Sequence, residues 1–150
     1  MTLFLAPNDW LGITFRLCVA LIVGAIIGLE RQIRNKPAGL RTHMLVSLGS
    51  ALFVLIPLQI TTDGEGRDAI SRVVQGITAG VGFLGAGEIL RESQEASSLA
   101  QVRGLTSAAA IWVCAALGIA AGCGLWQMGL IGAVLSLLVL SVFKRFEKHP

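Results

Sequence analysis

The chain has 150 residues, of which 54% are hydrophobic and 14% are charged, and its mean hydropathy is +0.75. A soluble domain carries roughly 25% charged residues, so this composition excludes an ordinary soluble protein and predicts an integral membrane protein. The net charge is only +3, and the basic residues stand between apolar runs, which excludes a basic nucleic-acid-binding face.

The first two apolar runs cover residues 11–29 and 42–60. Each has 19 residues, enough to cross a hydrocarbon core of about 30 Å at about 1.5 Å per residue. The first run holds one charge, Arg16, which we expect to pair with Asp68 or to reach outward to the interface. Pro57 is expected to kink or end the second helix.

The third run covers residues 70–90 and is rich in glycine. Its glycines are Gly76, Gly80, Gly82, Gly85 and Gly87. In water each would weaken a helix by about 1 kcal/mol relative to alanine. In a bilayer, small residues instead allow helix backbones to approach closely. We therefore predict that this run is the central helix of a bundle, with neighbouring helices packed against its glycines.

A polar segment, 91–103, separates the third run from the last apolar stretch, and we expect it to form a loop or a short surface helix. Residues 105–143 carry no charge at all. As one helix these 39 residues would be about 58 Å long, almost twice the hydrocarbon core. The stretch must therefore fold back, and Gly122-Cys123-Gly124 is the expected turn between spans at 105–121 and 125–143.

Five spans place the two termini on opposite sides of the membrane. One side receives loops 30–41 and 91–103 and the C-terminal tail, with nine of the twelve Lys and Arg residues; the other receives the acidic loop 61–68. The basic side is expected to face the cytoplasm. The sequence thus predicts a single all-α transmembrane domain over residues 1–150, with the N-terminus outside and the C-terminus inside.

Three pairs of glycines have the four-residue spacing typical of packed transmembrane helices. The pairs are Gly24 with Gly28, Gly76 with Gly80, and Gly118 with Gly122. We interpret them as packing faces within the bundle, with homodimerisation as the alternative. The three cysteines lie in apolar runs and are interpreted as small buried residues, because an odd number argues against a complete disulfide framework.

Several separate blocks of the chain, over about residues 13–140, resemble the MgtC/SapB family, in the same order. They are Gly28-Leu29-Glu30-Arg31, residues 36–46 (KPAGLRTHMLV), Gly49-Ser50-Ala51-Leu52-Phe53, Arg72, residues 80–87 (GVGFLGAG), residues 102–109 (VRGLTSAA) and Ile111-Trp112.

This resemblance implies a multi-pass protein of the bacterial inner membrane. Some members of the family are linked to survival at low magnesium and inside host cells, and to modulation of the F-type ATP synthase. The magnesium-linked virulence members carry a soluble C-terminal domain after the membrane part. Because the sequence ends at Pro150, we expect the resemblance to cover their membrane domain only.

On this topology a set of polar residues converges at the cytoplasmic side. The set is Glu30, Arg31, Arg41, Thr42, His43, Glu88, Arg103 and Thr106. One interpretation is a site for a cation or a partner; the other is a ring of salt bridges, such as Glu30–Arg41 and Glu88–Arg103, that fixes the helix ends. His43 is expected to be an interfacial hydrogen-bonding residue, with titration near neutral pH as the alternative. At the outer end the charges to consider are Arg16, Asp68 and Arg72.

Magnesium prefers hard oxygen ligands, so Glu30 and Glu88 inside, or Asp63, Glu65 and Asp68 outside, could supply carboxylates. The acidic loop is more simply a solvated loop, and its spacing matches no metal-binding motif. The sequence therefore identifies no defined metal ligands and implies no cofactor, with Mg²⁺ as a candidate ligand only.

No Walker loop, HExxH or GxSxG motif is present, which argues against an enzyme. We expect an accessory protein that supports magnesium homeostasis or stress adaptation by modulating a membrane-protein partner, or that acts as a homo-oligomer. The alternatives are a cation (Mg²⁺) transporter or channel using the cytoplasmic polar site, and a structural membrane subunit. The fourth and fifth spans offer few polar groups for an ion path, which favours the accessory role.

Overall fold

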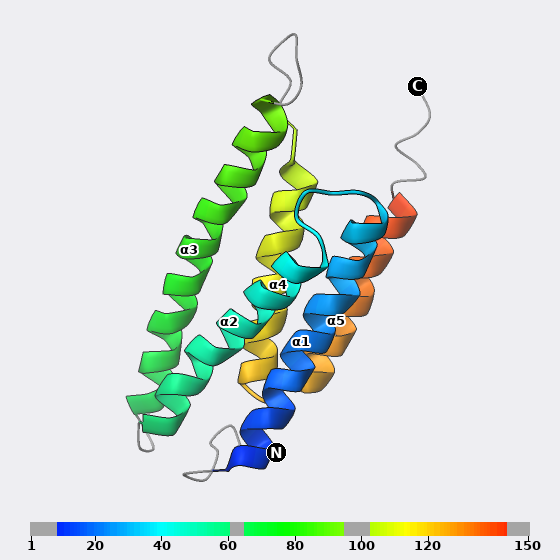
Figure 1. Cartoon of the computed structure of the whole chain (residues 1–150). Helices are drawn as coiled ribbons and strands as arrows, with labels where there is room; N and C mark the ends of the chain where they lie inside the picture. Colours follow the sequence, from blue (N-terminus) through cyan, green and yellow to red (C-terminus); the bar gives the residue numbers. More distant parts are fainter. Residues whose placement is uncertain (1–8, 61–64, 95–102, 144–150) are drawn as a thin grey trace.

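The computed structural model describes residues 9–60, 65–94 and 103–143, and every regular element among them is helical. Five helices alternate in direction along the bundle, as Figure 1 shows. Their bounds are α1 (Trp10–Ile33), α2 (Leu40–Ile60), α3 (Glu65–Gln94), α4 (Leu105–Gly122) and α5 (Trp126–Leu138). A π-helical segment, η1 (Val139–Phe143), continues α5. The predicted all-α fold of five helices is confirmed.

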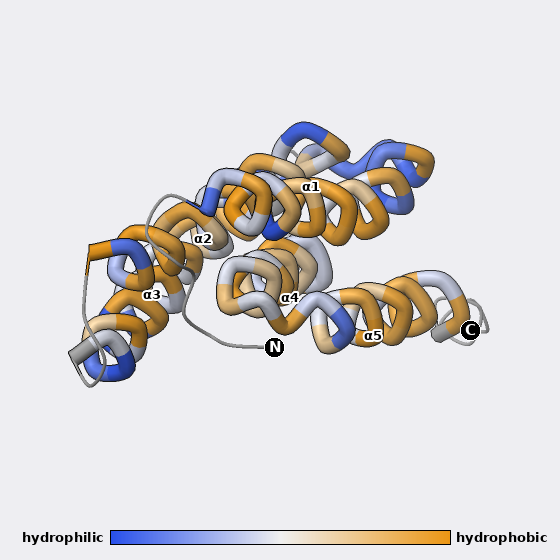
Figure 2. Tube along the Cα trace, turned by 90° about the horizontal axis from the view of Figure 1, so that it is seen from below, coloured by the Kyte–Doolittle hydropathy of each residue, from blue (hydrophilic) through white to orange (hydrophobic). Residues whose placement is uncertain are grey.

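Four of these helices, α1 to α4, are long and apolar enough to cross a membrane. The fifth is a shorter apolar helix, at Trp126–Val142. Large apolar side chains cover the outside of the bundle: Leu11 of α1, Phe83 of α3 and Ile131 of α5 are all more than half exposed. Such a surface suits lipid rather than water. In Figure 2 most of the hydrophilic residues lie toward the helix ends, with apolar tubes between them.

The central helix is α4, which packs against α1, α2, α3 and α5. The prediction that the glycine-rich third span is central is therefore wrong. Helix α3 lies at one side of the bundle and packs mainly against α4 and α2 (Figure 1). The physical reason is that α4 is the richest in alanine, so other helices can pack closely around it. At most glycines of α3, by contrast, an added Cβ would meet no described atom of another helix within 4 Å.

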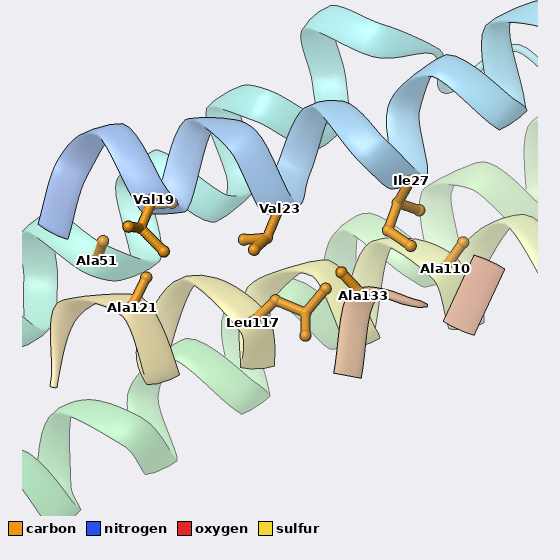
Figure 3. Packing of buried hydrophobic residues seen from close by; sticks show 9 residues of the cluster. Val19, Val23, Ile27, Ala51, Ala110, Leu117, Ala121 and Ala133 are labelled. Carbon is orange, nitrogen blue, oxygen red and sulfur yellow. The ribbon is translucent and has the colours of Figure 1, made fainter. Parts of the chain in front are cut away.

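The core lies between α1 and α4. Val19, Val23 and Ile27 of α1 point toward the alanines and Leu117 of α4, with Ala51 of α2 and Ala133 of α5 closing the sides (Figure 3). Small residues let the helices approach. A Cβ atom added to Gly118 would lie 2.2 Å from the backbone oxygen of Ser47. Helices α2 and α4 are therefore in backbone contact.

The turn between α4 and α5 lies where the sequence predicts it, whereas α2 continues past its proline. Helix α4 ends at Gly122 and α5 begins at Trp126, as the Gly122-Cys123-Gly124 turn predicts. Gly124 has a φ of 77°, a conformation that glycine adopts without strain. Pro57, however, does not end α2, which continues to Ile60. The polar segment at 91–103 begins inside α3, which extends to Gln94, and its residues 95–102 lie outside the described chain.

Candidate functional site

A buried polar cluster lies at the end of the bundle where α1 ends and α2 and α4 begin. Arg31 is 3% exposed, and its Nη2 donates a hydrogen bond to Ser107 Oγ at 3.2 Å, which ties α1 to α4. Its Nη1 lies 3.5 Å from Glu30 Oε2, and Arg34 Nε donates to the other Glu30 oxygen. Both oxygens of Glu30 are therefore bound by guanidinium groups, and the predicted Glu30–Arg41 pair is wrong.

His43 of α2 lies next to this cluster and is fully buried, at 0% exposure. Its Nδ1 lies 2.8 Å from the carbonyl oxygen of Gly39, one turn earlier, and donates a hydrogen bond to it, because a carbonyl oxygen can only accept. In the described chain its Nε2 is buried without a hydrogen-bond partner, and so is Nε of Arg31. His43 thus makes a hydrogen bond, as expected, and it is enclosed within the bundle because α1 approaches closely at Gly28.

The charges of this cluster do not suit a divalent cation. Glu30 contributes one negative charge, and Arg31 and Arg34 contribute two positive charges. Among the described residues, no group of three or more His, Cys, Asp or Glu side chains could hold a metal ion.

The remaining residues of the predicted cytoplasmic set are not part of the cluster. Arg41 and Thr42 are exposed at the start of α2, and Arg103 and Thr106 are exposed beside the start of α4. Glu88 is half-buried on α3, and within the described chain its Oε1 has no hydrogen-bond partner, so the predicted partner Arg103 does not bind that oxygen. The structure therefore brings together Glu30, Arg31 and His43 only.

Arg16 lies at the opposite end of the bundle and is also 3% exposed. Its Nη1 donates a 2.8 Å hydrogen bond to the carbonyl oxygen of Gly122, at the end of α4. The expected pair with Asp68 is wrong, because Asp68 is exposed on α3 and the guanidinium turns to the α4 terminus, where carbonyl groups lack helical donors. Burial raises the pKa of the neighbouring Cys123 thiol, against the opposing effect of Arg16.

Arg72 is exposed near the start of α3. Of the three acidic residues expected at the outer end, the structure describes only Asp68 in full. Asp63 and the side chain of Glu65 lie outside the described residues. The cysteines are free: Cys114 is buried as expected, with Sγ donating to the His43 carbonyl at 3.1 Å, but Cys18 is exposed.

The glycines predicted to form packing faces behave differently in different helices. Gly24, Gly28, Gly118 and Gly122 each lie where an added Cβ would come within 3.0 Å of a neighbouring helix backbone. By contrast, an added Cβ at Gly76, Gly80, Gly82 or Gly87 would meet nothing within 4 Å in the described chain. Gly85 makes a moderate approach, at 3.3 Å, to Ala108. Of the α3 glycines, Gly85 alone therefore packs against another helix among the described residues.

Two adjoining spaces lie beside α2. The first, which we call the α2–α3 groove, has a volume of about 620 Å³ and is lined by Leu45, Val46, Gly49, Ser50, Phe53, Val73, Gly76, Ile77, Gly80, Val81 and Leu84. The second, which we call the headgroup-end pocket, has a volume of about 440 Å³ and is lined by Gln32, Pro37, Gly39, Arg41, Thr42, Leu45 and Val46.

Sequence reasoning missed Arg34, Ser107 and Ser47. Ser107 is 1% exposed and binds Arg31, and Ser47 is fully buried with Oγ donating to the Ala20 carbonyl at 2.7 Å. A signal for Arg34 was present, since it follows Glu30 by four residues on the same helix face. No comparable local signal exists for the serines, because their partners lie on other helices.

Known proteins resemble this chain in sequence. The model of the MgtC family matches residues 17–149. The chain is 54% identical over 150 residues to protein SrpB of Synechococcus elongatus, covering 97% of this chain and 82% of that protein. It is 45% identical over 133 residues to YhiD of Escherichia coli K12, whose name marks it as a candidate magnesium transporter, covering 85% of this chain and 59% of YhiD.

Protein MgtC of Salmonella typhimurium is 40% identical over 138 residues, which cover 89% of this chain and 55% of MgtC. The chain thus spans somewhat over half the length of YhiD and MgtC. No solved structure matches the chain. The family match covers nearly all of the sequence and agrees with the helical, multi-pass membrane fold described above. This chain belongs to the MgtC family.

Proposed function

We propose that this chain is a non-catalytic accessory protein of the bacterial inner membrane, and that it supports magnesium homeostasis or stress adaptation by acting on a membrane partner. The magnesium link is drawn from the name of YhiD and from family membership. The accessory role is drawn from the distribution of polar groups in the bundle.

One observation carries the accessory role: an apolar layer separates the two buried polar ends. Arg16 and Glu30 are fourteen residues apart on α1, about 21 Å along the helix, and the buried residues between them are apolar. The buried hydroxyls of Ser47 and Ser50 already donate to backbone carbonyls. A hydrated ion would therefore find no continuous set of polar partners through the interior of one chain.

Helix α3 offers the surface for a partner. Phe83 is 82% exposed, and the neighbouring small residues Ala79, Gly82 and Ala86 are exposed as well. Small residues three and four positions apart share a helix face and allow a foreign transmembrane helix to approach closely, and the adjacent Phe83 supplies contact area.

The alternative is a cation transporter that uses the cytoplasmic-side polar residues. The observation that favours it is Glu88, whose buried Oε1 has no hydrogen-bond partner in the described chain. A carboxylate oxygen of this kind could bind a cation, if a path were completed between copies of the chain.

The test measures Mg²⁺ entry into proteoliposomes that contain the purified protein and a trapped indicator dye, with Glu88→Gln as the paired variant. We expect no uptake above that of empty liposomes from protein shown to be folded by circular dichroism. Saturable uptake that disappears in Glu88→Gln would overturn the accessory role in favour of the transporter.

The partner is sought by placing a photoreactive amino acid at position 83 in native membranes. The matched control replaces Ile131 of α5, which is also strongly exposed, at 61%. We expect a discrete cross-linked product from position 83 and none from position 131. Equal products from both positions, or none from either, would contradict docking on α3.

A further inference from the structure

The α2–α3 groove has the chemistry of a hydrocarbon site. Its lining is apolar apart from Ser50, whose hydroxyl donates a 2.8 Å hydrogen bond to the Val46 carbonyl and is thereby satisfied. Its volume of about 620 Å³ lies within the range of roughly 300–1,000 Å³ that is usual for small-molecule sites. An occupant of the groove must therefore present apolar surface.

The headgroup-end pocket has the opposite chemistry. Its lining includes the exposed Arg41 and the hydroxyl of Thr42, and no carboxylate. The nearest expected counter-ion, Glu30, is bound by Arg31 and Arg34 and so does not neutralise Arg41. An occupant of this pocket is therefore favoured if it carries a negative charge with several acceptor oxygens.

The two spaces adjoin each other, because Leu45 and Val46 line both of them. From Arg41 to Phe53 is twelve residues, or about 18 Å of helix. This is close to the depth of one leaflet, which is half of a hydrocarbon core of about 30 Å. On α2 the lining of the groove ends at Phe53. Past this point α2 and α3 come together, where α2 ends and α3 begins (Figure 1).

We propose that these adjoining spaces hold one anionic phospholipid of the bilayer, with an acyl chain in the α2–α3 groove and the phosphate at Arg41 and Thr42. A transmembrane helix, from a partner or a second copy, would need a surface that crosses the whole membrane, whereas this groove is one leaflet deep. Basic pockets beside transmembrane helices are known to take anionic headgroups. The inference holds whichever way the chain is oriented and does not depend on the accessory role.

The experiment is native mass spectrometry of the full chain, released from detergent after incubation with dioleoyl phosphatidylglycerol or dioleoyl phosphatidylcholine. Two variants test the two ends: Arg41→Gln for the phosphate, and Gly80→Leu, which places a side chain in the groove. Their matched controls are Arg67→Gln, an exposed arginine near the start of α3, and Gly87→Leu, an open glycine that does not line the groove.

We expect the wild-type chain to retain phosphatidylglycerol in preference to phosphatidylcholine. Arg41→Gln should lower phosphatidylglycerol retention about fivefold, the effect of one basic side chain near an anionic headgroup, while phosphatidylcholine retention stays the same. Gly80→Leu should lower retention of both lipids, and both controls should behave as wild type.

Three results would overturn the proposal. The first is an unchanged lipid preference in Arg41→Gln. The second is equal lipid retention in Gly80→Leu and Gly87→Leu. The third is a dimer without bound lipid that Gly80→Leu dissociates, which would assign the groove to a second copy of the chain. Circular dichroism of each variant shows that loss of lipid is not loss of fold.

Discussion

At the scale of single residues, the same glycine spacing has opposite consequences in different helices. Gly118 and Gly122 face the backbone of α2, whereas Gly76 and Gly80 face open space. The spacing shows only that two glycines share a helix face, and the neighbour of that face decides their role. Gly118 is the extreme case, because an added Cβ would lie 2.2 Å from the Ser47 oxygen, which is backbone and cannot turn aside.

We therefore predict that Gly118→Ala destabilises the bundle and Gly80→Ala does not. The first change forces α2 and α4 apart, which we expect to cost about 1–3 kcal/mol, as overpacking of a core usually does. The second adds a methyl group where nothing lies within 4 Å. Thermal unfolding of both variants in the same detergent compares them directly. Similar midpoints for the two would show that α2 and α4 are not in backbone contact.

At the scale of helices, α4 holds the bundle together at both of its ends. Ser107 at its start binds Arg31 of α1, and the Gly122 carbonyl at its end binds Arg16 of α1. Terminal carbonyls of a helix have no donor within the helix, so a buried end needs a partner from elsewhere. In this fold Arg16 of α1 binds the carbonyl at the end of α4, and Arg31 of α1 binds the hydroxyl of Ser107 near its start. Together these two hydrogen bonds set the register of the two helices.

Arg16→Leu is expected to lower the free energy of unfolding by about 1.5–3 kcal/mol, because it removes a hydrogen bond from a charged donor and leaves the Gly122 carbonyl buried. Arg72→Leu serves as the control, since Arg72 is exposed on α3 and its change should stay within about 0.5 kcal/mol. Chemical denaturation in detergent measures both. An effect of Arg72→Leu as large as that of Arg16→Leu would refute the capping role.

At the scale of the whole molecule, one end of the bundle is more basic than the other. Loop 34–39, the end of α3 and the end of η1 share this end, as the alternating directions of the helices require (Figure 1). The positive-inside rule then predicts that this end faces the cytoplasm.

Fusions test that orientation. Green fluorescent protein joined after residue 150 should fluoresce, since it folds in the cytoplasm, and alkaline phosphatase inserted after residue 62 should be active, since it requires the oxidising exterior. The same reporters exchanged between the two positions should both be silent. A fluorescent fusion at residue 62 together with an active phosphatase at residue 150 would reverse the orientation.

The sequence by itself determined the helices and their order. Long uncharged runs can satisfy their backbone groups in lipid only as helices, and the 39-residue run without charge had to turn, which it does at Gly122-Cys123-Gly124. Resemblance of its sequence blocks also sufficed to indicate the family that the comparisons confirm. These features depend on residues that are close together along the chain.

Only the tertiary structure decided which helix is central and which polar groups meet. Nothing local distinguishes Gly118, which touches Ser47, from Gly80, which touches no other helix. Likewise, Arg31 and Ser107 are 76 residues apart, and Arg16 and Gly122 are 106 apart. All apolar faces are equivalent in lipid, so hydrophobic pattern alone cannot rank the helices, and the steric fit between backbones makes the choice.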